Sequence, residues 1–264
     1  MNTGTGHAVN YAARTDVGKT REHNEDRYCV NADLGLYVVA DGMGGHACGE
    51  VASEIAVATI EQQIKQGSSL VDAIKSAHLA ILQGVKDGLG KHGMGTTVVA
   101  VQLQGDDYTM AWVGDSRAYL WDDGISQISK DHSMVQMLID SGQITQADAR
   151  THPRKNVIYQ SLGAADVESP QVSMKQGVLY KNQKIILCSD GLSDEVDDPQ
   201  ISEIVGLAKS VEEAAEKLVN TAIDNGGNDN VSVIVISASA NAFDKPLVDA
   251  SKNEVSKDTL IHDD

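Results

Sequence analysis

Acidic side chains recur in this sequence at the ends of apolar segments. Four aspartates and one acidic pair each border a strand-like apolar run beside a glycine or a polar turn: Asp41, Asp115, Asp190 and Asp229, with Glu25 and Asp26. Any one of them could be a helix cap or a turn residue. Gathered in one cleft they would repel each other, and cations would make the arrangement stable. Oxygen donors without cysteine or paired histidine favour Mg²⁺ or Mn²⁺ over Zn²⁺, and two such ions could activate a phosphoryl group and a bridging water.

The segment 36–46 carries this pattern in its sharpest form. Its apolar part ends on Asp41, and the glycine-rich turn Gly42-Met43-Gly44-Gly45 leads to His46. A strand end holds its last side chain rigidly, and glycines let other groups approach the backbone closely. Asp41 is therefore a candidate metal ligand or catalytic group. The alternative is a turn that requires glycine, with Asp41 as an ordinary helix N-cap.

Two other motifs suggest different chemistry, but the predicted elements around them do not fit it. Residues 42–47 fit the G-x-G-x-x-G/A dinucleotide fingerprint, but Asp41 would set a negative charge against a pyrophosphate, and the next segment after the helix predicts a second helix and not a strand. Residues 114–118 resemble the G-x-S-x-G nucleophile elbow, which needs a strand, a turn and a helix. A strand is predicted after this turn instead, so Ser116 is a poor candidate nucleophile.

The composition limits the partners of the chain. Asp and Glu number 38 against 21 Lys and Arg, a formal charge of −17, which argues against nucleic acid and anionic membranes as partners. Any anionic substrate then needs local positive charge. Three cysteines without metal-type spacing, Cys29, Cys48 and Cys188, fit a reducing, cytoplasmic location better than a disulfide scaffold. We also expect no export signal, because residues 1–10 are polar, and no membrane span.

Hydrophobic periodicity predicts an α+β fold. The strands are predicted in hairpins and meanders and the helices in pairs, which favours antiparallel sheets covered by helices over a doubly wound parallel sheet. The predicted strands are 9–13, 27–32, 36–40, 95–104, 108–113, 117–121, 125–129, 184–188 and 231–237, and those between 95 and 129 are expected to form one meander. The predicted helices are 49–65, about 70–81, a segment within 131–153, 199–208 and one that begins after a capping box at Ser210.

Two segments carry no clear period. Residues 156–173 are polar and irregular, which is typical of a mobile flap. From Asn241 onward the chain is polar and charged, so we expect one domain over 1–240 and a flexible tail over 241–264.

Several short motifs, taken in order, resemble the PP2C-type metal-dependent protein serine/threonine phosphatases in their bacterial form. The motifs are Arg21-Glu22-His23-Asn24-Glu25-Asp26, Asp41-Gly42-Met43-Gly44-Gly45-His46, Gly95-Thr96-Thr97, Gly114-Asp115-Ser116-Arg117, Ser189-Asp190-Gly191-Leu192 and Asp229-Asn230-Val231-Ser232. Residues 131–133 and 152–157 also resemble bacterial members. Each motif is weak by itself, whereas the ordered set, from about residue 8 to 237, is specific.

The resemblance implies a four-layer α-β-β-α sandwich of two antiparallel sheets with two metal ions at one end. The implied ligands are Asp41 as a bridge between both ions, Asp190 and Asp229 on one ion, Glu25 and the Gly42 carbonyl on the other, Asp26 in the outer shell through water, and Asp115 with Asp190 on a weaker third ion. The ions would be Mn²⁺ or Mg²⁺.

The same resemblance implies two roles outside the ligand set. Arg21 would clamp the phosphate, which suits a planar bidentate donor, and His46 would act as the general acid. The chain departs from the family at Cys48, where a glycine is usual. This cysteine is either a tolerated small residue or a redox-sensitive thiol beside the metals.

The implied activity is that of a Mn²⁺- or Mg²⁺-dependent protein serine/threonine phosphatase. A metal-bridged hydroxide would attack phosphorus with no covalent enzyme intermediate. The partners would be phosphorylated proteins, the substrates of a Ser/Thr kinase, and the chain would act as a monomer. A non-catalytic regulatory module on the same fold is the alternative, and lost metal carboxylates would mark it; none is missing here. A different metal hydrolase, such as a nucleotidase, is the second rival.

Overall fold

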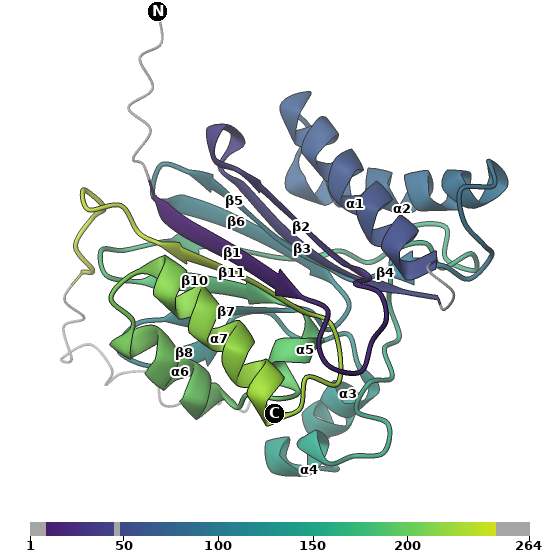
Figure 1. Cartoon of the computed structure of the whole chain (residues 1–264). Coiled ribbons are helices and arrows are strands. Elements are labelled where there is room, and N and C mark those ends of the chain that lie inside the picture. The colour runs from purple at the N-terminus through teal and green to yellow at the C-terminus, as the bar shows by residue number, and fades with distance from the viewer. Residues whose placement is uncertain (1–8, 45–47, 247–264) are drawn as a thin grey trace, which may run out of the picture.

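Two antiparallel β-sheets face each other between layers of helices in the computed structural model, which describes residues 9–44 and 48–246 (Figure 1). One sheet has the order β1-β11-β10-β7-β8 and the other the order β2-β3-β5-β6-β9, with β4 paired to β3. The strands are β1 (Asn10–Asp16), β2 (Asp26–Asn31), β3 (Leu36–Met43), β4 (Gly95–Thr96), β5 (Val98–Gln104), β6 (Asp107–Val113), β7 (Arg117–Trp121), β8 (Ile125–Gln127), β9 (Ser173–Val178), β10 (Lys184–Cys188) and β11 (Val231–Ser237).

Helices cover the outer face of each sheet. The helices are α1 (Cys48–Lys65), α2 (Leu70–Lys86), α3 (Met134–Asp140), α4 (Gln146–Arg150), α5 (Asp190–Ser193), α6 (Asp198–Leu207) and α7 (Val211–Asn225), with a short 3₁₀ helix at Ala32–Leu34. The pair α1 and α2 packs on the sheet that contains β3, and α6 and α7 pack on the sheet that contains β11 (Figure 1). The α+β class and the four-layer sandwich expected from the sequence are confirmed.

Three apolar layers hold these four layers of secondary structure together. Alternate residues of β3 serve two of them: Leu36 and Val38 face the α1–α2 pair, whereas Tyr37 and Val39 face the opposite sheet. Strand β11 divides its side chains in the same way between α7 and the space between the sheets. This is the two-residue period of a strand that is buried on both faces, and it fixes the register in which the strand ends reach the edge of the sandwich.

The predicted meander between residues 95 and 129 is wrong. Strand β6 pairs with β5 and β9, whereas β7 pairs with β10 and β8 in the other sheet, so the chain crosses between the sheets at 114–116. Periodicity shows that a strand is buried but does not name its partner, and that is why the crossing was missed. Strand β9 was missed because it is a largely exposed edge strand without clear alternation.

The structure describes the expected helix within 131–153, the irregular segment after it and the start of the expected tail. The expected helix within 131–153 is two short helices, α3 and α4, and residues 156–172 are irregular apart from isolated bridges at Ile158 and Leu162. At the start of the expected tail, the Phe243 carbonyl accepts a hydrogen bond from the Lys181 N–H at 2.9 Å, and Lys245 pairs with Asp122. The boundary at residue 240 stays a prediction. No helix within the described residues is long and apolar enough to cross a membrane.

Candidate metal centre

A cleft of about 270 Å³ lies at one end of the sandwich and collects most of the residues singled out in the sequence. Its lining includes Arg21, Glu25, Asp41, Gly42, Asp115, Asp190 and Asp229, and it adds Met43, Gly44, Thr97, Asn156 and Ile158. Asp26 does not line the cleft. His46 lies outside the described residues. The structure therefore brings together every other member of the predicted site, although these residues come from five separate parts of the chain.

The end of β3, which carries Asp41, is fixed by close backbone contacts. A Cβ atom on Gly42 would lie 2.1 Å from the carbonyl oxygen of Gly49, so the first turn of α1 can cross the strand end only where both residues are glycine. The Gly42 N–H donates to the Glu25 carbonyl at 3.2 Å, which holds the second predicted ligand beside the first. Asp41 is thereby held rigidly at the floor of the cleft.

Thr97 connects Asp41 to the turn that carries Asp115. Its backbone N–H donates to the Asp41 carbonyl at 2.9 Å, and its hydroxyl accepts from the Asp41 N–H at 3.2 Å. The same hydroxyl lies 2.6 Å from the hydroxyl of Ser116, which is buried. Gly114 has a φ of +105° and its α-carbon packs against Thr97, so the chain can turn sharply there as it changes sheets. Ser116 is thus a structural link, in agreement with its poor standing as a nucleophile.

Asp26 lies behind the cleft and joins three strands. It is 2% exposed, and its Oδ2 accepts a hydrogen bond from the Ser189 hydroxyl at 2.8 Å. The Ser189 hydroxyl in turn accepts from the Ser232 N–H at 2.9 Å. Asp26 is thus hydrogen-bonded to the residue before Asp190 without lining the cleft itself, which is consistent with the outer role that was predicted for it.

Asn230 is a positioning residue that the sequence reasoning did not assign. Its Oδ1 accepts from the Glu25 N–H at 2.8 Å, and its Nδ2 donates to the carbonyls of Val17 and His23 at 2.9 and 3.0 Å. It therefore clamps the loop between β1 and β2 against the start of β11, next to Asp229. Its place in the motif 229–232 was the available signal.

The carboxyl groups of the site hold their protons more tightly than ordinary aspartates. Burial, with neighbouring carboxylates adding to it, raises the pKa of Asp190 to about 6, of Asp26 to about 7 and of Asp115 to about 8. The same two causes raise the pKa of Asp41 well above its usual value. Closely spaced buried carboxylates without compensating cations are costly in their charged form, and bound cations remove that cost.

The donor atoms fit divalent cations that prefer oxygen. The Oδ1 atoms of Asp26 and Asp190 are buried without a hydrogen-bond partner, and the described lining of the cleft contains carboxylates, a main-chain carbonyl and no thiol. Asp229 instead pairs with Arg21, whose Nη2 lies 2.6 Å from Oδ2. As they stand, no three acidic, histidine or cysteine side chains among the described residues form a complete ligand set. The ligand set predicted from the sequence would therefore form only if these side chains converged and Asp229 turned away from Arg21.

Comparison with known proteins defines the class. The chain matches the family described as Protein phosphatase 2C over residues 3–225, and it belongs to that family. The Mycobacterium tuberculosis serine/threonine protein phosphatase PstP is 39% identical over 234 residues, which are 86% of this chain and 44% of that protein. The Listeria innocua serine/threonine phosphatase Stp is 35% identical over 237 residues, which are 84% of this chain and 93% of that protein.

A solved structure extends the likeness to the fold. The catalytic domain of a serine/threonine protein phosphatase PstP, in complex with two manganese ions, superposes with a TM-score of 0.76 at 36% identity, over 87% of this chain and 97% of that one. The present chain spans less than half the length of the M. tuberculosis relative, and nearly all of the Listeria relative.

Proposed function

We propose that this chain is a Mn²⁺- or Mg²⁺-dependent phosphatase that hydrolyses phosphoserine and phosphothreonine in proteins. The observation that carries the proposal is the single cleft in which Glu25, Asp41, Asp190 and Asp229 meet at the ends of two sheets. Membership of the protein phosphatase 2C family, and the two manganese ions named for a relative, support the same reading.

The carboxylates of the cleft would hold the metal ions. Asp41 would hold both ions, with Asp190 and Asp229 on one and Glu25 and the Gly42 carbonyl on the other; Asp115 with Asp190 would serve a weaker third ion. Asp26 would orient water in the outer shell. When bound, the core ions supply Lewis-acid activation of the phosphoryl group and of the attacking water. No side-chain nucleophile is needed.

Two further residues would act on the phosphoryl group directly. Arg21 is half exposed at the rim of the cleft, where its planar guanidinium can grip two phosphate oxygens and orient the ester. His46 would donate a proton to the departing serine or threonine oxygen, which is a poor leaving group without one. With phosphate held and the leaving oxygen protonated, hydrolysis needs no covalent intermediate on the chain.

The substrates would be phosphoproteins, the products of a Ser/Thr kinase. The charge of −17 disfavours nucleic acid and anionic membrane as partners, and we propose a cytoplasmic monomer. The alternative of a non-catalytic regulatory module has no specific observation in its favour, because the carboxylates that such a module would have lost all line the cleft or lie behind it.

The test is release of phosphate from phosphothreonine and phosphoserine peptides by the purified chain. We expect turnover with Mn²⁺ or Mg²⁺ and none after a chelator is added, with recovery when the metal is restored. Metal binding without turnover of any phosphopeptide would contradict the proposal and favour the regulatory module. Turnover that persists in the chelator would contradict the metal-dependent site.

A further inference from the structure

A second cavity, of about 300 Å³, opens directly beside the metal cleft. Asp115, Asn156 and Asp190 line both spaces, so residues next to a phosphate held in the cleft are within reach of this cavity. The remaining lining comes from α3, α4 and residues 193–199 between α5 and the start of α6, and Arg117, Asp131 and Lys155 complete it. None of these elements has a role in the chemistry proposed above.

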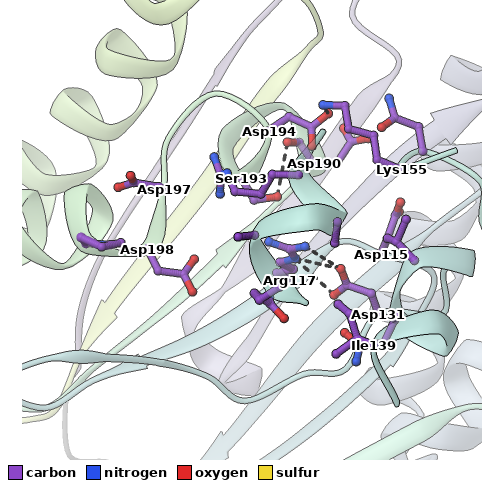
Figure 2. Close-up of a pocket in the computed structure, with 18 residues that line it drawn as sticks. Asp115, Arg117, Asp131, Ile139, Lys155, Asp190, Ser193, Asp194, Asp197 and Asp198 are labelled. Carbon is purple, nitrogen blue, oxygen red and sulfur yellow. Dashed lines mark hydrogen bonds and ion pairs between the residues drawn. The ribbon is translucent and has the colours of Figure 1, made fainter. Parts of the chain in front are cut away.

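The two sides of the cavity differ in polarity. Helices α3 and α4 contribute an apolar wall that includes Val135, Ile139 and Ala149. The opposite side carries Asp197 and Asp198 at the start of α6, and Figure 2 shows this pair across Arg117 from Asp115 and Asp131. A side chain that enters from the cleft would thus meet hydrocarbon on one side and carboxylates on the other.

Four of the nine charged side chains of the lining compensate each other in two ion pairs. Arg117 donates to Asp131 with Nη2 at 2.7 Å, and Lys155 pairs with Asp194 at 2.7 Å (Figure 2). Asp197 accepts from the Gln200 N–H at 2.9 Å as the cap of α6, and no cation pairs with it among the described residues. These two ion pairs leave the acidic side chains at the start of α6 uncompensated.

Asp198 is the carboxylate most free to bind a ligand. Among the described residues it has no hydrogen-bond or ion-pair partner, although it is partly buried at the cavity wall. Arg150 at the end of α4 is the one cation of the lining without a carboxylate partner in the described part of the chain. It is exposed, whereas Asp197 and Asp198 are partly buried. The balance of uncompensated charge is therefore acidic even when the metal-facing aspartates are set aside.

We propose that this cavity binds a lysine or arginine side chain of the phosphoprotein, close in sequence to the phosphorylated residue. The proposal rests on the function proposed above and names the substrate class that the site prefers. The aliphatic stem of the basic residue lies against Val135 and Ile139, and its cationic head reaches Asp198. The overall charge of the chain favours the same class of substrate, because it repels acidic surroundings of the phosphate.

The experiment compares phosphothreonine peptides that differ at one position. Each position within about four residues of the phosphothreonine, a reach of about 13 Å of extended chain, carries lysine, norleucine or glutamate in turn. We expect at least one position at which lysine raises kcat/KM over norleucine by about two- to fivefold, within the range of a partly exposed ion pair. In Asp198→Asn that preference should fall to about one, while turnover of p-nitrophenyl phosphate stays unchanged.

Two further variants fix the interpretation. Glu203→Gln removes the same charge from an exposed position of α6 outside the cavity, and it should keep the lysine preference. Asp198→Lys should reverse the preference in favour of glutamate at the same position. Normal turnover of p-nitrophenyl phosphate by each variant shows that it is folded.

The outcomes separate this inference from the proposed function. Phosphopeptide turnover without any lysine preference, or a preference that Asp198→Asn keeps, would overturn the inference alone. A preference for glutamate in the unmodified chain would assign the cavity to Arg150 and overturn it as well. No metal-dependent turnover of any substrate would overturn the proposed function, and this inference with it.

Discussion

The turns that carry the carboxylates and the segment that borders them, residues 134–159, are held in different ways. The Thr97 hydroxyl accepts a hydrogen bond from the Asp41 N–H, and the Asn230 side chain makes three hydrogen bonds to the backbone of the β1–β2 loop. In the bordering segment, α3 buries only Val135 and α4 only Ala149, while Tyr159 is 50% exposed. A reacting centre tolerates little displacement, whereas a surface that receives varied proteins benefits from adaptable contacts. We infer that chemistry belongs to the first region and substrate choice to the second.

The largest effect should come from removing a carboxylate of the first region. Asp41→Asn and Asp190→Asn should each abolish metal-dependent turnover, a loss beyond the roughly 10–100-fold typical of residues in the outer shell. The fold should survive, because each change removes a buried charge and does not create one. Phosphate release at saturating Mn²⁺, with circular dichroism as a check of folding, measures this.

The matched control is Asp194→Asn in the same α5 region. Asp194 lines the second cavity and pairs with Lys155, but it does not line the metal cleft. It should retain turnover of p-nitrophenyl phosphate within a few-fold. Near-normal activity in folded Asp41→Asn or Asp190→Asn would remove the metal assignment.

The second effect separates leaving-group chemistry from phosphate binding. His46→Ala should slow hydrolysis of a phosphothreonine peptide by about 10²–10⁴-fold, the usual contribution of a general acid, and spare p-nitrophenyl phosphate, whose phenolate leaves without help. Arg21→Ala should weaken both substrates, because it binds the phosphate that they share. The values of kcat and KM for both substrates decide between the roles. Equal losses on the two substrates in His46→Ala would show a structural or metal-positioning histidine.

A third, smaller effect concerns stability. Asn230→Ala leaves one N–H and two carbonyls of the β1–β2 loop without partners, and should cost about 2–3 kcal/mol in the free energy of unfolding. Ser133→Ala removes the cap of α3, where the hydroxyl accepts from the Gln136 N–H, and should cost about 1 kcal/mol. Urea unfolding of both variants tests the contrast between the regions. Equal losses would mean that the bordering segment is as firmly fixed as the turns.

The raised carboxyl pKa values predict how the stabilisation by metal depends on pH. Asp190, Asp26 and Asp115 have folded pKa values of about 6, 7 and 8, above the value of about 3.9 in an unfolded chain. Between these values the unfolded state binds fewer protons, so the chelated protein should lose stability as the pH rises to about 8. Bound metal displaces those protons. The increase in Tm caused by saturating Mn²⁺ should therefore be larger at about pH 8 than at about pH 6, and an increase that shrinks with pH would contradict the assignment.

The sequence predicted the strands and the ligands better than the way in which they are connected. Strands β3, β10 and β11 were identified because their apolar runs border a turn, and the motifs named the carboxylates that the cleft collects. The change of sheet after β6 was missed because both sheets bury similar side chains, and hydrophobic pattern does not choose between two buried neighbours.

The contacts that support the site could not be predicted from the sequence, because they join residues that are far apart in the chain. Asn230 accepts a hydrogen bond from the Glu25 N–H, 205 residues away in the sequence, so the residues next to Asn230 give no indication of this contact. The ion pair between Arg21 and Asp229, 208 residues apart, was not expected, because each residue had been assigned a different partner. The second cavity depends on α3 and α4 lying across it from the start of α6, an arrangement that no periodicity encodes.

The most direct test of the account is the number and arrangement of Mn²⁺ ions that the purified chain binds. Equilibrium dialysis combined with electron paramagnetic resonance would count the ions and detect magnetic exchange between them. We predict two tightly bound ions per chain, as named for the solved relative, with the exchange-coupled spectrum of a pair that shares the Asp41 carboxylate. In Asp41→Asn the coupling should disappear. A single tight ion, or two ions without exchange coupling in the unmodified chain, would contradict the central claim that the strand-end carboxylates form one dinuclear centre.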